Sequence, residues 1–417
     1  MMIKSISRYI ILGGVLLAFA ATTFAQSGST RPRRVNPPPT SSRTESSAPP
    51  TANGTDERSA RPTASVNTAR PRGANPTATS TGTRRAYELL EQKQYAAAAR
   101  EAKQVAAANP NDSEAWKIAG FAEINLKQHA EAATDLQRAL DLQRAAGQED
   151  ANTVDALAQA YILTEKFEQA LPLLVTATTR PGAAPVASML YYRGVAEYQT
   201  GKAAEAERSF NAAVKANPKD AASLYYLGQI AFKGGRLDES IAFLNRATLN
   251  DARIASAWAL LTTAYLRRAA AATVETKADA DYLSAVRAGE SLTRVRADAE
   301  TSTLFAQALI GAKQFARAAT VLERVTTGDD AKGVTLYLLG VSHSRAKNYP
   351  KAISALERAA AKTPDDVNVY RELGYAYEVS KQYAKAFDAY QKGAALAPAD
   401  TDFKESVERV RPYAQKQ

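Results

Sequence analysis

The sequence contains no cysteine and only two histidines among its 417 residues, which limits the chemistry it can perform. Without cysteine there are no disulfides, thiolate metal sites, cysteine nucleophiles or cysteine-linked lipid anchors. His129 and His343 are far apart in the sequence, and neither belongs to a cluster of ionisable residues. Because catalytic and metal sites need several such groups together, we expect no enzyme activity, no metal site and no cofactor.

Other signatures of catalysis are equally scarce. No glycine-rich phosphate-binding loop is present, and the acidic residues recur at helical spacing, often near lysine or arginine, as is typical of solvated helix faces. Ser344 and Lys347 match a serine-x-x-lysine nucleophile pattern. The partner motifs of that pattern are missing, so we interpret the match as a coincidence.

The one long apolar run lies near the start of the chain. Tyr9–Ala21 is apolar and follows the basic residues Lys4 and Arg8. It is shorter than the ~20 residues that span a bilayer, and a small-residue site ending at Ala25 follows it. We therefore expect residues 1–25 to be a signal peptide cleaved after Ala25 rather than a retained anchor. The mature chain would be periplasmic, associated with the outer envelope, or secreted.

Residues 26–82 differ in composition from everything that follows. They hold nine of the 18 prolines and no Phe, Trp or Tyr, so they cannot bury enough apolar surface to fold, and we predict a disordered tail. The tail carries a net charge of +5 and residues 1–25 carry +2, which leaves only +3 of the total +10 for residues 83–417. A phosphate-binding groove would concentrate charge in the folded part, so we expect no nucleic-acid partner.

From residue 83 onward the chain is built on a repeat of 34 residues or slightly more. Ala187–Asp220 holds two apolar helical stripes separated by Thr200-Gly201-Lys202, and Pro218 follows the second stripe. A small residue recurs in each first helix, at positions 86, 120, 158, 194, 228, 262, 306, 340 and 374. A second small column lies in the second helices, at positions 98, 132, 170, 206, 240, 285, 318, 352 and 386. Small residues at both places let the two helices of a unit pack closely.

This pattern resembles the tetratricopeptide repeat, a helix-turn-helix unit of about 34 residues. Two units carry most of the family's motif positions: Trp116, Gly120, Ala132, Leu136 and Ala139 in one, and Tyr370, Leu373, Gly374, Tyr377, Ala386, Tyr390 and Pro398 in the other. The resemblance implies an all-α, right-handed superhelical solenoid of nine repeats over residues 83–400. The predicted units are 83–112, 113–146, 151–184, 187–220, 221–254, 255–298, 299–332, 333–366 and 367–400.

Two departures from the regular repeat carry further predictions. About ten extra residues fall between Ala269 and Asp281, and because they are alanine-rich and lack proline and glycine, we expect them to lengthen both helices of the sixth unit. After the last repeat, Phe403, Val407 and Val410 form an apolar stripe. Residues 401–417 therefore contain a predicted helix that caps the open end of the solenoid.

In the family, the first helices line a concave groove that binds extended peptides or helices. On that resemblance, the predicted groove is rich in tyrosine, which offers large contact area with few rotatable bonds. Its predicted residues are Tyr191, Tyr192, Tyr198, Gln199, Tyr225, Tyr226, Gln229, Phe232, Lys233, Tyr337, Arg371 and Tyr375.

The function that we favour from sequence is a non-enzymatic scaffold of the bacterial cell envelope that binds a partner protein or peptide in this groove. The alternative is a tether to an anionic envelope polymer or a membrane surface, acting through the basic tail. A third alternative is an enzyme, which would need an active site that the sequence does not show. For the tail itself, composition favours a solubilising spacer over specific binding.

Overall fold

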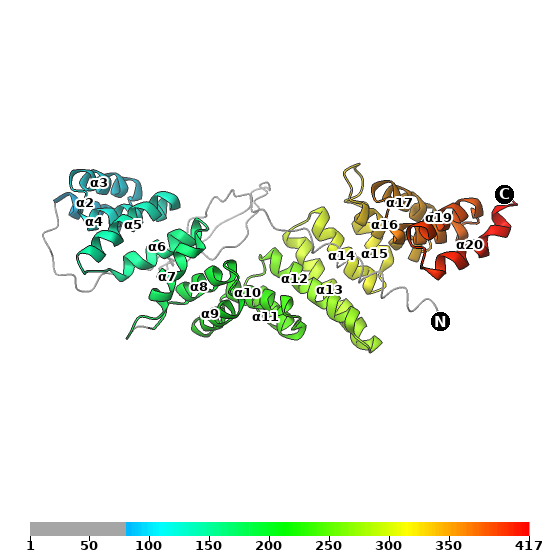
Figure 1. The fold of residues 1–417 in the computed structure, drawn as a ribbon, viewed down its shortest axis with the longest axis horizontal. Helices are drawn as coiled ribbons and strands as arrows, with labels where there is room; N and C mark the ends of the chain where they lie inside the picture. The colour runs from blue at the N-terminus through cyan, green and yellow to red at the C-terminus, as the bar shows by residue number, and fades with distance from the viewer. Residues whose placement is uncertain (1–80, 183, 417) are drawn as a thin grey trace, which may run out of the picture. The chain divides into compact units, whose positions relative to one another are not determined.

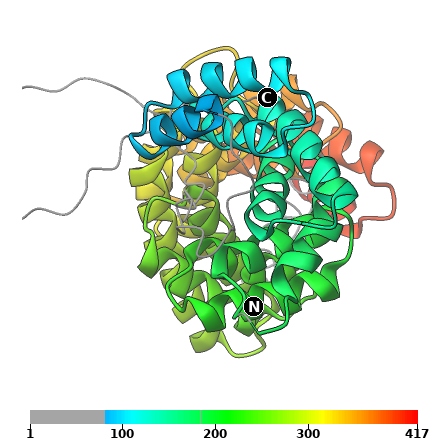
Figure 2. The ribbon, with the colours of Figure 1, turned by 90° about the vertical axis from the view of Figure 1, so that its left-hand side faces the viewer.

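The computed structural model describes residues 81–182 and 184–416, which contain nineteen helices and no strand. These helices follow one another as antiparallel hairpins (Figures 1 and 2), and this confirms the predicted all-α repeat fold. The described residues fall into two compact units, 81–251 and 252–416. The predicted signal peptide and tail lie outside the described residues.

The unit of residues 81–251 contains five helical hairpins. Their helices are α2 (Thr81–Glu91) with α3 (Tyr95–Ala108), α4 (Ser113–Leu126) with α5 (His129–Ala145), α6 (Ala151–Leu163) with α7 (Phe167–Thr178), α8 (Ala187–Gln199) with α9 (Ala203–Ala216), and α10 (Ala221–Lys233) with α11 (Leu237–Asn250).

The unit of residues 252–416 contains four hairpins and one further helix. Its helices are α12 (Ala255–Ala271) with α13 (Glu275–Val295), α14 (Ala299–Gly311) with α15 (Phe315–Glu323), α16 (Gly333–Arg345) with α17 (Tyr349–Lys362), α18 (Val367–Val379) with α19 (Tyr383–Leu396), and the final α20 (Thr401–Ala414).

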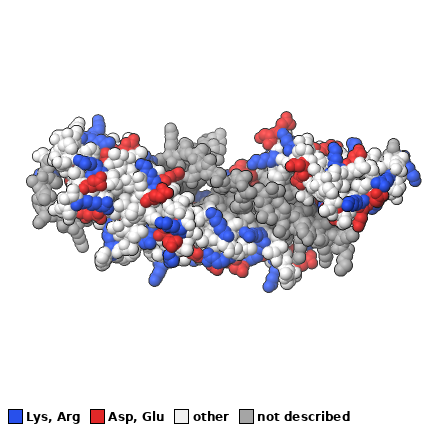
Figure 3. Space-filling model, viewed as in Figure 1, with Lys and Arg blue, Asp and Glu red and all other residues white. Residues whose placement is uncertain are grey.

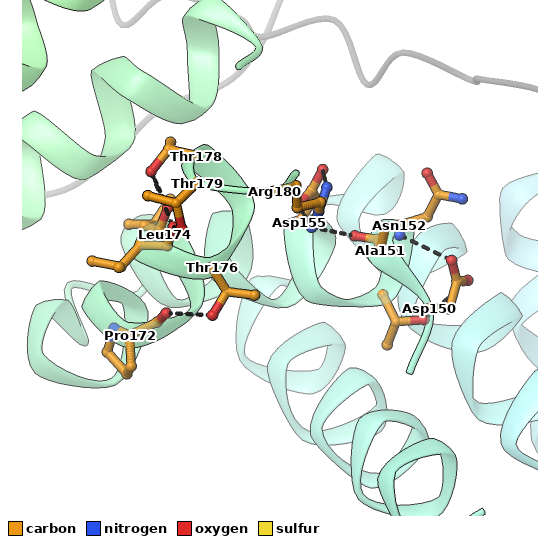
Figure 4. A network of polar contacts seen from close by, with 12 residues as sticks. Asp150, Ala151, Asn152, Asp155, Pro172, Leu174, Thr176, Thr178, Thr179 and Arg180 are labelled. Carbon is orange, nitrogen blue, oxygen red and sulfur yellow. Dashed lines mark hydrogen bonds and ion pairs between the residues drawn. The ribbon is translucent and has the colours of Figure 1, made fainter. Parts of the chain in front are cut away.

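Local sequence signals fix the ends of these helices. Asp150 is the N-cap residue just before α6, and its side chain accepts a hydrogen bond from the backbone N–H of Asn152 at 3.0 Å (Figure 4), which satisfies a donor that the first turn leaves free. In the same hairpin, Arg180 donates to Asp155 and to the carbonyl of Ala151, so the segment after α7 is held against the first helix (Figure 4). Between the two helices of the next hairpin, Gly201 takes a left-handed φ of 80°.

The two small-residue columns form the contact between the helices of each hairpin. All nine members of the second column, from Ala98 to Ala386, have no exposed surface. In the fourth hairpin, a Cβ atom on Gly194 of α8 would lie 2.7 Å from the ring of Phe210 on α9, and Phe210 is itself completely buried. The Phe210 ring therefore fills the space that a side chain at position 194 would occupy.

The insertion in the sixth hairpin lengthens both of its helices, as predicted. The helices α12 and α13 have 17 and 21 residues, whereas α10 and α11 have 13 and 14. Arg268 of α12 and Asp281 of α13 form a two-pronged ion pair with distances of 2.9 and 2.6 Å, which joins the two helices beside the extension. Two packed helices are thus extended together, and no long loop is formed.

The predicted capping helix is present as α20. Phe403, Val407 and Val410 are all buried, with exposed fractions of 1%, 8% and 1%. The ring of Phe403 packs edge-on to Tyr390 of α19, with 6.5 Å between the ring centroids. On the outer side of α20, Arg409 donates two hydrogen bonds to Glu378 of α18. The last helix therefore covers the apolar face of α19 and links back to α18.

We expect Gly194→Val to destabilise the unit of residues 81–251 by about 1–3 kcal/mol, because the added side chain collides with Phe210. Thermal or denaturant unfolding of the purified chain measures the change. Gly234→Ala is the matched control, since its new Cβ would find its nearest neighbour at 3.4 Å and meet no steric conflict. Equal stability of the two variants would contradict the packing argument.

We expect Phe403→Ala to weaken the packing of α20 against α19 by about 3–5 kcal/mol in free energy, because it removes the largest buried side chain of α20. Hydrogen exchange followed by mass spectrometry should show lost protection over residues 401–414 and α19, with little change in α12 and α13. Lys404→Ala, on an exposed position of the same helix, should leave the protection unchanged.

Candidate partner-binding surface

The first helices of successive hairpins contact one another within each unit. In residues 81–251, α4 contacts α6, α6 contacts α8 and α8 contacts α10, and in residues 252–416 the same holds for α12, α14, α16 and α18. The second helices of successive hairpins make no comparable contact within the described units. Because the first helices form the more closely spaced row, they line the inner side of each unit.

Tyrosine side chains from α8 and α10 form one continuous aromatic cluster. Tyr226 stacks on the buried ring of Phe210, with 4.9 Å between centroids and 5° between the planes. Tyr191, Tyr198 and Tyr225 surround Tyr226, with centroids at 6.2, 5.5 and 5.5 Å. The structure therefore brings together four of the predicted groove residues. We call Tyr191, Tyr198, Tyr225 and Tyr226 the tyrosine face.

Phe210 anchors this surface from beneath, and the sequence prediction did not include it. Its ring lies 6.1 Å from Tyr191 as well as against Tyr226, so it supports two members of the tyrosine face. The sequence signal that could have identified Phe210 is the glycine at position 194, because a position without a side chain on one helix leaves room for a large side chain from the paired helix.

The exposure of the predicted residues divides them into two groups. The four members of the tyrosine face and Gln229 are half-buried, while Gln199 and Lys233 are exposed. Tyr192 and Phe232 are only 4% and 8% exposed, so we correct their assignment from the groove to the packing between helices. For Tyr192 the reason is that its ring packs in the core cluster shared with residues of α6 and α7.

Lys233 places a positive charge at the edge of the tyrosine face. Its Nζ lies 4.8 Å from the centroid of the Tyr198 ring and also donates to the Tyr198 hydroxyl. This arrangement combines a cation–π contact with a hydrogen bond and holds the Tyr198 ring in place. The surface thus offers aromatic rings, hydroxyl groups and one ammonium group within a small area.

The other predicted groove residues lie in the unit of residues 252–416 and differ in environment. Tyr337 is 8% exposed, and burial raises the pKa of its phenol, so its assignment to an open groove is corrected to core packing. Arg371 is occupied by an ion pair with Asp400 and lies 4.4 Å over the ring of Phe403, where it fastens α20. Tyr375 is 42% exposed, with the Arg345 guanidinium 5.9 Å from its ring centroid.

Two expectations about polar residues have different outcomes. His343 is buried with its Nε2 3.3 Å from Glu323, and burial lowers the pKa of the imidazole, as suits a packed residue. The expectation that acidic residues are solvated is wrong for Glu123, Glu197 and Glu372, which are 1%, 2% and 3% exposed. Each has a basic partner: Lys103, Arg193 and Arg345.

Over residues 81–182 and 184–416, no group of acidic or histidine side chains has the arrangement of a metal site. No described helix is long and apolar enough to cross a membrane. On the face shown in Figure 3, basic and acidic side chains are interspersed over the described surface, in keeping with the nearly balanced charge of residues 83–417.

The comparison with solved structures returns repeat proteins of low identity. A tetratricopeptide repeat protein from Cytophaga hutchinsonii is 13% identical with a TM-score of 0.45, over 60% of this chain and 98% of that one. YrrB, described as having an unusual peptide-binding site, is 16% identical with a TM-score of 0.41, over 48% and 99%. A repeat protein from Parabacteroides merdae is 12% identical with a TM-score of 0.39, over 63% and 98%. The search of curated proteins finds no significant match.

The tetratricopeptide repeat model matches residues 83–150, 156–210, 194–257 and 337–401, which together make up more than half of the chain. Proteins of this family generally mediate protein–protein interactions and are generally not enzymes. With the helical hairpins, the small-residue columns and these matches in agreement, the chain belongs to the tetratricopeptide repeat family.

Proposed function

We propose that this protein is a non-enzymatic interaction scaffold that binds a peptide segment of a partner protein on the tyrosine face. The observation that carries the proposal is the cluster of Tyr191, Tyr198, Tyr225 and Tyr226 on adjacent first helices, supported from below by Phe210. Stacked rings on rigid helices lose little conformational freedom on binding, so they suit an interface centre.

The polar groups around the tyrosine face indicate which kind of peptide it accepts. Gln199 and Gln229 are amide side chains that can pair with an extended backbone, and the Lys233 ammonium lies at the rim. An extended or helical segment with apolar side chains would place those side chains against the rings. We propose such a segment as the ligand class of this surface.

We further propose that the scaffold acts outside the cytoplasm of a bacterium, in the cell envelope. This proposal rests on the sequence of residues 1–25 alone, where a basic start, an apolar run and a small-residue site follow in order. A disulfide-free chain is compatible with export, since cysteine is not needed to stabilise a packed helical array.

We expect the double variant Tyr191→Ala with Tyr225→Ala to bind the partner at least about tenfold more weakly. Central aromatic residues of an interface commonly contribute about 1–2 kcal/mol or more each to the binding free energy. The partner is captured from an envelope extract of the source organism with the wild-type chain, identified, purified and titrated against each variant. Circular dichroism checks that helix content is retained.

Tyr413→Ala is the control for this experiment, because Tyr413 is a 53% exposed tyrosine on α20, outside the tyrosine face. It should bind the partner like the wild-type chain. A double variant with unchanged affinity would rule out the tyrosine face. Capture that disappears in high salt, and that the double variant does not affect, would instead favour the basic residues 26–82 as the binding segment.

For the proposed export, we expect the protein purified from its source to begin at Gln26, because Ala25 ends the small-residue site. N-terminal sequencing or intact-mass measurement of the envelope fraction gives the answer. Replacing Ala25 with Phe should block processing. A mature protein that still begins at Met1 would contradict the prediction of a cleaved signal.

A further inference from the structure

The second hairpin buries two carboxylates against a single basic side chain. Glu123 of α4 and Asp135 of α5 are 1% and 6% exposed. Lys103 of α3 pairs with Glu123 and lies 3.4 Å from Asp135 Oδ2. Within the described part of the chain, Glu123 Oε2 is buried without a hydrogen-bond partner, and the buried Asp135 Oδ2 has the long Lys103 contact and no well-formed hydrogen bond. With both acids ionised, the cluster is one positive charge short of balance.

The fourth hairpin shows how the same position is balanced elsewhere in this chain. Glu197 stands three residues after Gly194, as Glu123 stands three residues after Gly120. Arg193 Nε lies 2.8 Å from Glu197, and the Ser209 hydroxyl donates to it at 2.6 Å. Ser209 occupies the register position of Asp135, so this hairpin has one acid for one base. The shortage of one positive charge, relative to the two carboxylates, therefore distinguishes the second hairpin from the fourth.

Glu123 lines a cavity that opens to solvent. The cavity has a volume of about 610 Å³ and lies between α3 and the turn that joins α4 to α5. Its charged lining residues are Arg100, Lys103, Glu123 and Glu131. A side chain of a ligand can therefore approach Glu123, the lining member of the acidic pair, from outside without unfolding the hairpin. Buried charges of one sign favour a ligand of the opposite sign.

The proton equilibrium of Glu123 agrees with a missing positive charge. Burial, with the nearby Asp135 carboxylate, raises the pKa of Glu123 to about 7, although Lys103 acts in the opposite direction. Burial also raises the pKa of Asp135, and the Glu131 carboxylate on the same helix acts in the same direction. Around neutral pH Glu123 is thus protonated about half of the time, and this proton balances the charge that a cation would balance. A cationic ligand and this proton compete, so the ligand should bind more tightly as the pH rises.

We propose that this cavity binds a basic peptide side chain, with a guanidinium or ammonium group completing the charge balance of Glu123 and Asp135. Arginine is the better match, because its planar group can donate to two carboxylates at once. The chain itself carries Arg58, Arg61, Arg70 and Arg72 shortly before α2, and a partner peptide could supply the same chemistry. This site is separate from the tyrosine face and does not depend on the function proposed for it.

The probe for this site is a fluorescein-labelled synthetic peptide of residues 67–73, Asn-Thr-Ala-Arg-Pro-Arg-Gly, titrated against the full chain by fluorescence anisotropy. The same peptide with both arginines replaced by glutamine is the control probe. The protein is used as wild type and as a variant in which Arg58, Arg61, Arg70 and Arg72 are all changed to serine, which removes the competing internal source.

We expect the arginine peptide to bind the four-serine variant about tenfold more tightly at pH 8 than at pH 6, because Glu123 changes from mostly protonated to mostly ionised across that interval. Weaker binding to the wild-type chain than to this variant would identify the chain's own arginines as the natural occupant. Equal binding to both would show that the chain's own arginines do not occupy the site, so that the basic group would have to come from another molecule. Binding that is absent, or that does not change with pH, overturns the proposal.

Asp135→Ser, introduced into the four-serine variant, tests the acidic pair directly, because it places at position 135 the residue type that the fourth hairpin has at Ser209. It should reduce peptide affinity at pH 8 by about tenfold and weaken the pH dependence, which the burial of Glu123 partly maintains, with helix content unchanged. Glu197→Gln, at the matching register of α8, should leave peptide binding as it was. An Asp135→Ser chain that binds as tightly as its parent at pH 8 would contradict the proposed site.

Discussion

The structure depends on one steric fit, in which a small residue on the first helix of a hairpin receives a side chain from the second helix. Gly194 and Phe210 show the fit, since even a single methyl group on Gly194 would collide with the ring. The same distance along the chain relates Ala158 to the buried Leu174 and Ala306 to the buried Leu322. Each hairpin is therefore a closely packed pair, and its remaining apolar side chains are left to contact the neighbouring hairpin.

The fit also determines what the surface can present. Phe210 fills the space beside Gly194, and its opposite side supports the ring of Tyr226. The tyrosine face is thus built on a core contact and does not rely on a mobile loop. A partner that binds there meets rings already held in position, so little of the binding free energy is spent on ordering the surface.

One register position on the first helices makes polar contacts to neighbouring helices, and its residue type decides which polar groups are buried there. In several hairpins the residue three positions after the small residue of the first helix contacts the preceding second helix. Tyr161 donates to Gln137 in this way, and His343 contacts Glu323. Glu123 occupies this position in the second hairpin and meets Lys103. Asp135 adds a second carboxylate to a place that the packing has already buried, and an unbalanced charge results.

The sequence by itself determined the repeat, the helical hairpins, the lengthened sixth hairpin and the final capping helix, because apolar periodicity, small residues and prolines act locally along the chain. It also indicated tyrosines on α8 and α10 as candidates. Only the tertiary structure decided that Tyr191 and Tyr226 lie half-buried at the surface while Tyr192 and Tyr337 are packed inside. It alone placed Asp135 beside Glu123. The physical reason is that exposure and charge balance depend on which side chains from other helices arrive at the same point, and residue spacing within one helix does not contain that information.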